Sequence, residues 1–119
     1  MRNQRPSKHP DQWIGETFAM KIDRPIGSKH PRYASILYEL NYGYIPQTIA
    51  ADGSEVDAYL LGVNDPVERF EGQCIAIIFR QDDLEDKLII APIGQNFSDE
   101  EIMKLTNFQE QFFNSILIR

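Results

Sequence analysis

The chain contains one cysteine, Cys74, in 119 residues, which excludes an internal disulfide and favours a reducing compartment. No apolar run approaches the ~18 residues that a membrane-spanning helix requires. Residues 1–12 lack the apolar stretch of a signal peptide. We therefore expect a cytoplasmic protein that has no membrane partner.

Several common chemical motifs are also missing. The sequence has no glycine-rich loop that would cradle a phosphate chain, no HExxH zinc motif and no CxxC pair. The lone Cys74 begins the apolar run 74–79, where a thiol is expected to be a core residue rather than a nucleophile. Any catalytic chemistry must therefore come from carboxylates, basic side chains and tyrosines.

Positive charge is scarce overall, with 12 Lys and Arg against 18 Asp and Glu and a net charge of −6. This balance argues against a nucleic-acid partner, because binding phosphate backbones requires a basic face. The charge is unevenly distributed: residues 21–33 carry four basic residues and one acidic residue, whereas residues 82–86 are acidic without a base. The two segments could meet around a metal–phosphate ligand, but charge counts alone favour two solvated loops.

The length predicts one domain, residues 13–119, preceded by a loose polar arm at residues 1–12. Aromatic, β-branched and apolar stretches between turn residues predict five strands. Their expected bounds are Gly15–Ile22, Tyr42–Ala50, Glu55–Val63, Gln73–Arg80 and Lys87–Ile93.

A helix is predicted at Asp99–Asn114. Ser98 and Glu101 form a capping box, and Phe97 with Ile102 forms a hydrophobic staple. Apolar residues then recur at helical spacing, and we expect this stripe to pack in the core. Its members are Ile102, Leu105, Phe108 or Gln109, Phe112 and Ile116. The predicted fold is mainly β with α: a small OB-like five-stranded barrel plus a C-terminal amphipathic helix.

Asp52 and Asp57 flank a turn that contains Gly53. An Asp-Gly pair is a strong hairpin signal, and chain reversal there could bring both carboxylates to one end of a groove. Carboxylate oxygens suit Mg²⁺, which takes few protein ligands and keeps several waters. The alternative is a plain hairpin turn with a solvated Asp57, and spacing alone does not separate the two.

The combination of segments resembles the family I soluble inorganic pyrophosphatases. The resemblance rests first on Asn41–Pro46 (NYGYIP), followed by Asp52–Asp57 (DGSEVD) and by an acidic stretch that leads into Lys87. It extends over nearly the whole chain, with gaps, through Ile22–Pro25, Gly27–Lys29 and Gln111–Phe113. Such a family member is expected to be an OB-like barrel that hydrolyses pyrophosphate to two phosphates with several Mg²⁺ ions.

The resemblance also implies roles for individual residues. Those expected to bind metal are Asp23, Asp52, Asp57, Asp83 and Asp86, with Asp82 and Glu85 as substitutes in the acidic loop. Those expected to bind substrate phosphates are Arg24, Lys29, Arg32, Tyr42 and Lys87. Asp57 and Glu55 are the expected catalytic groups. Homo-oligomers are common in the family, so self-association is a further expectation.

Three departures from the family pattern bear on activity. The hairpin that the family has between the basic loop and NYGY is missing, and with it an expected phosphate-binding arginine. Ser54 occupies the position at which the family usually has a third Asp, and a serine hydroxyl cannot replace a carboxylate as a general base. Asn114 and Ser115 stand where the family has a Tyr-Lys pair. We therefore expect weakened pyrophosphate hydrolysis. The alternative is a catalytically degenerate relative that binds metal and a phosphorylated small molecule, or that serves as an interaction module.

Overall fold

The structure is a computed structural model that describes residues 10–50, 53–83 and 85–119. A 3₁₀ helix, η1, spans Pro10–Trp13, and one α-helix, α1, spans Asp99–Glu110. The strands in chain order are β1 (Thr17–Arg24), β2 (Asn41–Ile45), β3 (Val56–Leu60), β4 (Arg69–Arg80), β5 (Asp86–Ala91) and β6 (Ser115–Ile118). Most of the expected arm at residues 1–12 lies outside the described residues, and residues 10–12 belong to η1.

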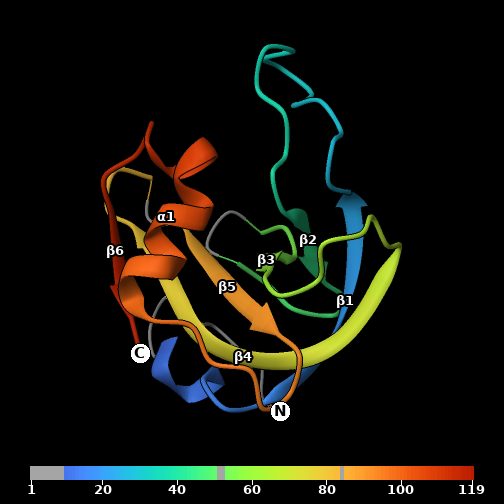
Figure 1. Ribbon diagram of the computed structural model, residues 1–119. Coiled ribbons are helices and arrows are strands. Elements are labelled where there is room, and N and C mark those ends of the chain that lie inside the picture. The colour runs from blue at the N-terminus through green and yellow to red at the C-terminus, as the bar shows by residue number, and fades with distance from the viewer. Residues whose placement is uncertain (1–9, 51–52, 84) are drawn as a thin grey trace.

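Five strands close into a barrel in the order β1-β2-β3-β5-β4, with β4 returning to pair with β1. Closure depends on the 12-residue β4, which curves across the bottom of the view in Figure 1. Its first half pairs with β1, its second half pairs with β6, and a bulge between Cys74 and Ala76 interrupts its ladder with β5. Bulges increase strand twist and bending, which is what a closed sheet requires. The predicted five-stranded OB-like barrel with a C-terminal helix is confirmed.

The predicted helix is too long, and a sixth strand follows it. The helix α1 ends at Glu110 instead of Asn114, and the apolar end of the chain forms β6 against β4. The Ile116-Leu117-Ile118 run is too short to reveal its state by periodicity, so only its pairing with β4 decides it. Leu105 is 37% exposed and Phe112 is 61% exposed, so the expected core stripe is only partly buried.

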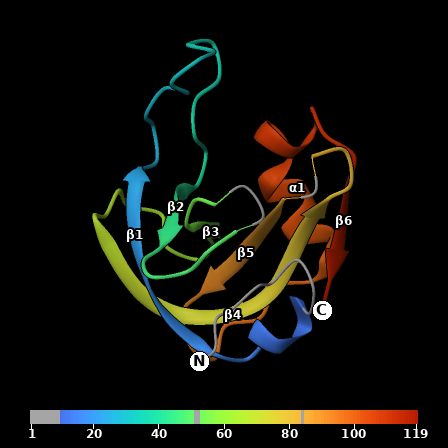
Figure 2. The same cartoon turned by 180° about the vertical axis from the view of Figure 1, so that it is seen from behind.

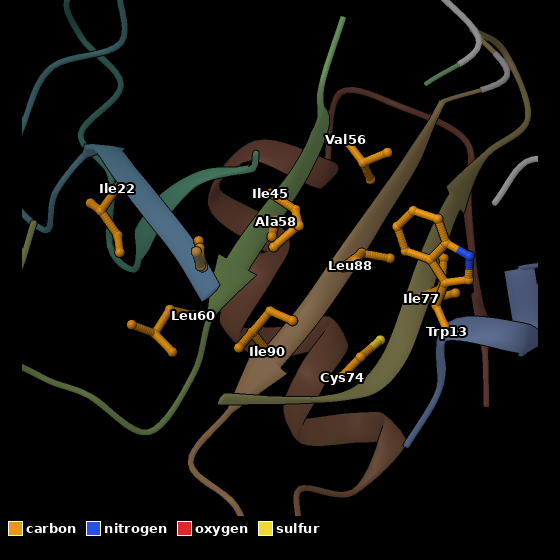
Figure 3. Packing of buried hydrophobic residues seen from close by; sticks show 11 residues of the cluster. Trp13, Ile22, Ile45, Val56, Ala58, Leu60, Cys74, Ile77, Leu88 and Ile90 are labelled. Atoms are coloured by element: carbon orange, nitrogen blue, oxygen red, sulfur yellow. The ribbon is translucent and has the colours of Figure 1, made fainter. Parts of the chain in front are cut away.

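Strand alternation divides the core into two layers. Side chains that face into the barrel form one cluster, which includes Trp13, Val56, Cys74, Leu88 and Ile90 (Figure 3). Alternate residues of the same strands face outward and are covered by α1. These outward residues include Tyr59, Ile78 and Ile89, which are fully buried. The helix α1 therefore packs on the outer face of β3 and β5.

The capping box that begins α1 is present as predicted. Ser98 accepts a hydrogen bond from the Glu101 N–H at 3.1 Å, and Glu101 accepts one from the Ser98 N–H at 2.8 Å. Phe97 and Ile102 belong to the same outer cluster, as the staple predicts. The described part of the chain has no helix long and apolar enough to cross a bilayer.

The NYGY segment forms β2, and two of its residues have structural tasks. The Asn41 side chain is fully buried, accepts from the Ile26 N–H at 3.1 Å and donates to the Asp65 carbonyl at 2.9 Å. Gly43 lies so close to β1 that a Cβ atom would lie 2.8 Å from the Ile22 Cα. Only glycine fits there, because that distance is shorter than a van der Waals contact.

The strands on either side of the predicted hairpin turn are shorter than expected, although the reversal itself is present: the Ala50 N–H donates to the Ser54 carbonyl at 2.7 Å and the Gly53 N–H donates to the Ala50 carbonyl at 3.0 Å. The strands pair antiparallel, but β2 ends at Ile45 and β3 begins at Val56. Pro46 cannot donate a ladder hydrogen bond, so the strand ends before it. The Thr48 hydroxyl then replaces the ladder by donating to the Ile45 carbonyl at 2.6 Å and accepting from the Val56 N–H at 2.9 Å. Asp52 lies outside the described residues.

A second long connection, residues 25–40, projects beyond the barrel from the ends of β1 and β2 (Figures 1 and 2). It is pinched by an antiparallel bridge between Lys29 and Leu37. Tyr38, near its C-terminal end, is buried against the outer cluster beside α1. One side of the projecting segment therefore faces the space next to α1, above the outer face of the barrel.

Candidate active site

Three neighbouring strands bring Asp57, Tyr42 and Lys87 together on the outer face of the barrel. β2 pairs with β3, and β3 pairs in parallel with β5, which places Asp57 directly opposite Lys87. The Lys87 ammonium donates to Asp57 Oδ2 at 2.7 Å, and the Tyr42 hydroxyl donates to the same oxygen at 3.0 Å. The cation also lies 5.9 Å from the centre of the Tyr42 ring. Three residues distant in the sequence therefore share one polar site.

Glu85 completes this site from the acidic loop. Its Oε1 accepts from the Lys87 ammonium at 2.7 Å, so a single lysine holds two carboxylates. The Lys87 side chain is 3% exposed, whereas those of Asp57 and Glu85 are 38% and 25% exposed. A buried ammonium is tolerated because both partners are charged. The two carboxylates remain accessible to a ligand from the solvent side.

The tyrosines near this site stay protonated. Burial, together with the charge of Asp57 and the hydrogen bond to it, raises the pKa of Tyr42 well above its usual value. Burial also raises the pKa of Tyr38. Tyr38 and Tyr42 are in ring contact, with centroids 5.3 Å apart. Both phenols are therefore hydrogen-bond donors throughout the neutral pH range.

A buried network borders the site under α1. Glu110 accepts from Arg80 Nε at 3.1 Å, from Arg80 Nη2 at 2.7 Å and from the Tyr59 hydroxyl at 2.7 Å. Gln109 donates to the Tyr59 hydroxyl at 2.7 Å and accepts from Tyr38 at 3.0 Å. Burial alone would lower the pKa of Arg80, but the hydrogen bonds and charge of Glu110 raise it. This network joins the helix, the barrel and the projecting segment.

Little in the sequence points to this network. Its one signal was that Glu110 falls on the same helical face as Ile102 and Thr106, at spacings of four residues. A charged residue on a buried face requires a partner. Nothing in the sequence pattern identified Arg80 as that partner, since 30 residues separate the two.

The acidic-loop residues expected to bind metal lie in different environments. Asp86 faces the opposite side of β5 from Lys87, is 4% exposed, and has an Oδ1 atom without a hydrogen-bond partner. Asp83 is paired with Arg80 Nη1 at 3.5 Å. Glu85, the substitute candidate, is the residue that shares Lys87 with Asp57. Asp86 is separated from the polar site because side chains alternate along β5, which turns Asp86 into the barrel and Lys87 outward.

The expected basic and upstream residues lie around the projecting segment. Arg24 at the end of β1 pairs with Asp23 at 3.6 Å, and both side chains are partly exposed. Lys29 and Arg32 are exposed on the segment itself. Glu55, an expected catalytic group, is exposed just before β3. Among the described residues, no hydrogen bond or ion pair joins these five to the Asp57 site.

A cavity of about 650 Å³ opens between the projecting segment, β4 and the chain that follows α1. Tyr42 lines it and also donates to Asp57, so this one side chain lies between the cavity and the polar site. Most other lining residues carry rings: His30, Tyr33, Tyr38, Phe112 and Phe113, with Arg80 stacked 3.7 Å over the Phe113 ring.

The donor set is compatible with Mg²⁺ but does not form a closed metal cage. Mg²⁺ commonly takes one or two carboxylates and completes its shell with water and substrate phosphates. Asp57 and Glu85 supply two partly exposed carboxylates around one ammonium. Across residues 10–50, 53–83 and 85–119, three or more acidic, histidine or cysteine ligands are nowhere gathered closely enough to hold an ion alone.

Comparison with known proteins agrees with this architecture. Residues 14–117 match the family model described as inorganic pyrophosphatase. The chain belongs to the inorganic pyrophosphatase family. The pyrophosphatase of Saccharolobus solfataricus is 26% identical over 93 residues, which cover 76% of this chain and 51% of that protein. That of Neisseria meningitidis serogroup B is 27% identical over 115 residues, covering 92% and 61%.

Solved structures of inorganic pyrophosphatases share this fold. That from Ehrlichia chaffeensis superposes with a TM-score of 0.66 at 16% identity, covering 86% of this chain and 84% of its own. That from Neisseria gonorrhoeae gives 0.62 at 21% identity, covering 79% and 72%. The chain spans between about half and three-fifths of the curated relatives that it matches. Family and fold are therefore established, while the relatives carry additional sequence.

Proposed function

We propose that this member of the pyrophosphatase family hydrolyses inorganic pyrophosphate to two phosphates in a Mg²⁺-dependent reaction. The observation that carries the proposal is the Asp57–Glu85–Lys87–Tyr42 site, in which two partly exposed carboxylates are held by a buried ammonium and one of them also by a phenol. Such a site offers oxygen ligands for a metal and hydrogen-bond donors for phosphate oxygens.

Asp57 and Glu85 are the proposed metal ligands, with Asp52 and Asp83 as further candidates. Glu85 is preferred to Asp86 because the Asp86 carboxylate is turned into the barrel. Asp23 remains a weaker candidate, since it lies at the end of β1 and pairs with Arg24. Bound Mg²⁺ would act as a Lewis acid that polarises phosphoryl oxygens and lowers the pKa of water.

The remaining groups have proposed roles in binding. Lys87 holds both carboxylates in place and can donate its remaining N–H to a phosphate oxygen, since an ammonium carries three donors. The raised pKa of Tyr42 keeps its hydroxyl protonated, and its single O–H positions Asp57 by donating to Oδ2. Arg24, Lys29 and Arg32 on the projecting side attract the anion from solvent. Exposed Glu55 is the candidate for proton transfer near Ser54, and we propose reduced turnover because Ser54 lacks a carboxylate.

The test measures phosphate release from pyrophosphate with Mg²⁺ and with EDTA, for the wild type and Asp57→Asn. We expect release that requires Mg²⁺ and falls by about 10- to 100-fold or more in the variant, as for other groups that support metal sites. Asp65→Asn is the matched control, because Asp65 is an exposed aspartate outside the site. Equal rates for the wild type and Asp57→Asn would contradict the proposal.

We further propose that the protein acts in the cytoplasm on this small-molecule substrate, without a nucleic-acid or membrane partner. The acidic net charge and the single buried cysteine support this. A homo-oligomer is proposed from family membership.

A further inference from the structure

The ring-lined cavity next to the proposed phosphate site is unsuited to a purely inorganic ligand. Its lining is dominated by Tyr33, Tyr38, Tyr42, Phe112 and Phe113. Pyrophosphate has no apolar surface and gains nothing from ring faces. A volume of about 650 Å³ lies within the ~300–1,000 Å³ range of pockets that enclose organic ligands. The cavity therefore has space and surface for a group that pyrophosphate lacks.

Two of these aromatic side chains are exposed to solvent, although the hydrophobic effect favours their burial. Phe112 is 61% exposed and Tyr33 is 54% exposed, and both line the cavity. They come from different parts of the chain: Phe112 follows α1, and Tyr33 lies on the projecting segment. Exposed aromatic side chains that line a cavity offer ring faces on which nucleobases stack.

Basic and polar groups near the cavity also suit a nucleotide. Arg24 and Arg32 lie close enough to His30, another lining residue, to contribute after burial to lowering its pKa. His30 Nδ1 accepts from the backbone N–H groups of Arg32 and Tyr33, at 3.1 and 3.2 Å. The neutral imidazole therefore carries its proton on Nε2 and can act as a donor. The cavity thus combines ring faces, a neutral donor and a basic rim.

We propose that the cavity binds the base of a nucleoside triphosphate whose phosphate chain extends past Tyr42 to the Asp57–Glu85–Lys87 site. The proposal rests on the proposed function, since it uses the same phosphate site and widens the substrate class from pyrophosphate to nucleotides. Tyr42 is the physical link: its ring lines the cavity and its hydroxyl contacts Asp57.

The test compares dissociation constants for ATP and for inorganic tripolyphosphate, both with Mg²⁺, by calorimetry. The two probes share a triphosphate chain and differ in the nucleoside. We expect ATP to bind about 5- to 100-fold more tightly, the range for one stacked base. Phe112→Ala should remove most of this preference and Phe112→Trp should retain it. Ile93→Ala, an equally exposed apolar residue outside the cavity, should leave the preference unchanged.

Equal affinity for ATP and tripolyphosphate in the wild type would overturn the proposal. So would a preference for ATP that survives Phe112→Ala. Neither outcome affects the proposed function, which fails separately if pyrophosphate release does not respond to Mg²⁺ or to Asp57→Asn. Tight, Phe112-dependent ATP binding without pyrophosphate hydrolysis would leave the nucleotide site in place and refute the enzymatic function.

Discussion

Replacing Glu110 by alanine should destabilise the protein more than any substitution on an exposed surface. Its carboxylate accepts four hydrogen bonds: two from Arg80, one from Tyr59 and one from Ser115 at 2.7 Å. Glu110 is 4% exposed and Arg80 is 5% exposed. Removing one partner of a buried ion pair costs about 3–5 kcal/mol, because the other charge stays buried without compensation.

The residual contacts of Arg80 cannot replace Glu110. Asp83 and Glu85 approach only Nη1, at 3.5 and 4.0 Å, whereas Glu110 binds Nε and Nη2. A domain of 119 residues has a total stability of about 6–18 kcal/mol, so the loss is a large fraction of it. The expected drop in melting temperature is roughly 10–25 °C.

Urea unfolding monitored by circular dichroism measures this free energy, and a double mutant separates its causes. Arg80→Met with Glu110→Met removes both charges, so we expect it to be closer to wild type than Glu110→Ala alone. A loss below about 1 kcal/mol for Glu110→Ala would refute the reasoning, since it would mean that Arg80 finds solvent or another partner at no cost.

The pH dependence gives a second check on the same residue. Burial alone would raise the pKa of Glu110, but the hydrogen bonds and charge of Arg80 lower it below the ordinary value of 4.5. The stabilisation is therefore complete above about pH 4.5 and is lost as pH falls through the folded-state pKa. The free-energy difference between wild type and Glu110→Gln should shrink as the pH is lowered from 7 toward 3.

Two further predictions concern other carboxylate positions. Burial raises the pKa of Asp86 from 3.8 to about 6, so its charged form destabilises the fold and stability falls as pH rises from about 4 to 6. Asp86→Asn should therefore raise the free energy of unfolding in metal-free buffer by roughly 1–3 kcal/mol at pH 7.5, with little gain at pH 4, and an equal gain at both would contradict this. Ser54→Asp should raise kcat for Mg²⁺-dependent pyrophosphate hydrolysis by roughly 10²-fold or more if a missing general base limits turnover. An unchanged kcat, with Asp57→Asn inactive in both backgrounds, would assign the deficit to phosphate binding instead.

Local chemistry made part of the site predictable. Two residues of β2 owe their roles to their residue type. Gly43 has no Cβ and so lets β1 approach closely. The Asn41 amide can both accept and donate, and so connects two loops. The Ser98–Glu101 capping box begins α1 for the same local reason. Strand alternation also determines that Asp86 and Lys87 point to opposite faces once β5 begins at Asp86.

The connection after β2 was less predictable, because it depends on a side chain that substitutes for backbone pairing. The Asp-Gly signal is borne out as a chain reversal, since the Gly53 N–H donates to the Ala50 carbonyl at 3.0 Å and the Ala50 N–H donates to the Ser54 carbonyl at 2.7 Å. What it did not show is that the regular ladder stops earlier, at Ile45, where the Thr48 hydroxyl takes over the pairing with Val56. The end of α1 failed similarly: the helical period continued past Glu110, but pairing with β4 draws the last residues into β6. At the end of α1, a contact from a distant strand outweighed local propensity.

The sequence by itself determined the family and the barrel with its helix, and it singled out Asp57, Tyr42 and Lys87 as candidate site residues, because these depend on residue types at short spacings. Only the tertiary structure decided that Glu85 rather than Asp86 shares Lys87 with Asp57. It also decided that Arg80 pairs with Glu110, and that Phe112 borders a cavity instead of filling the core. The physical reason is that strand pairing and helix docking join residues 30 or more positions apart, and no periodicity within one segment records which partner each will meet.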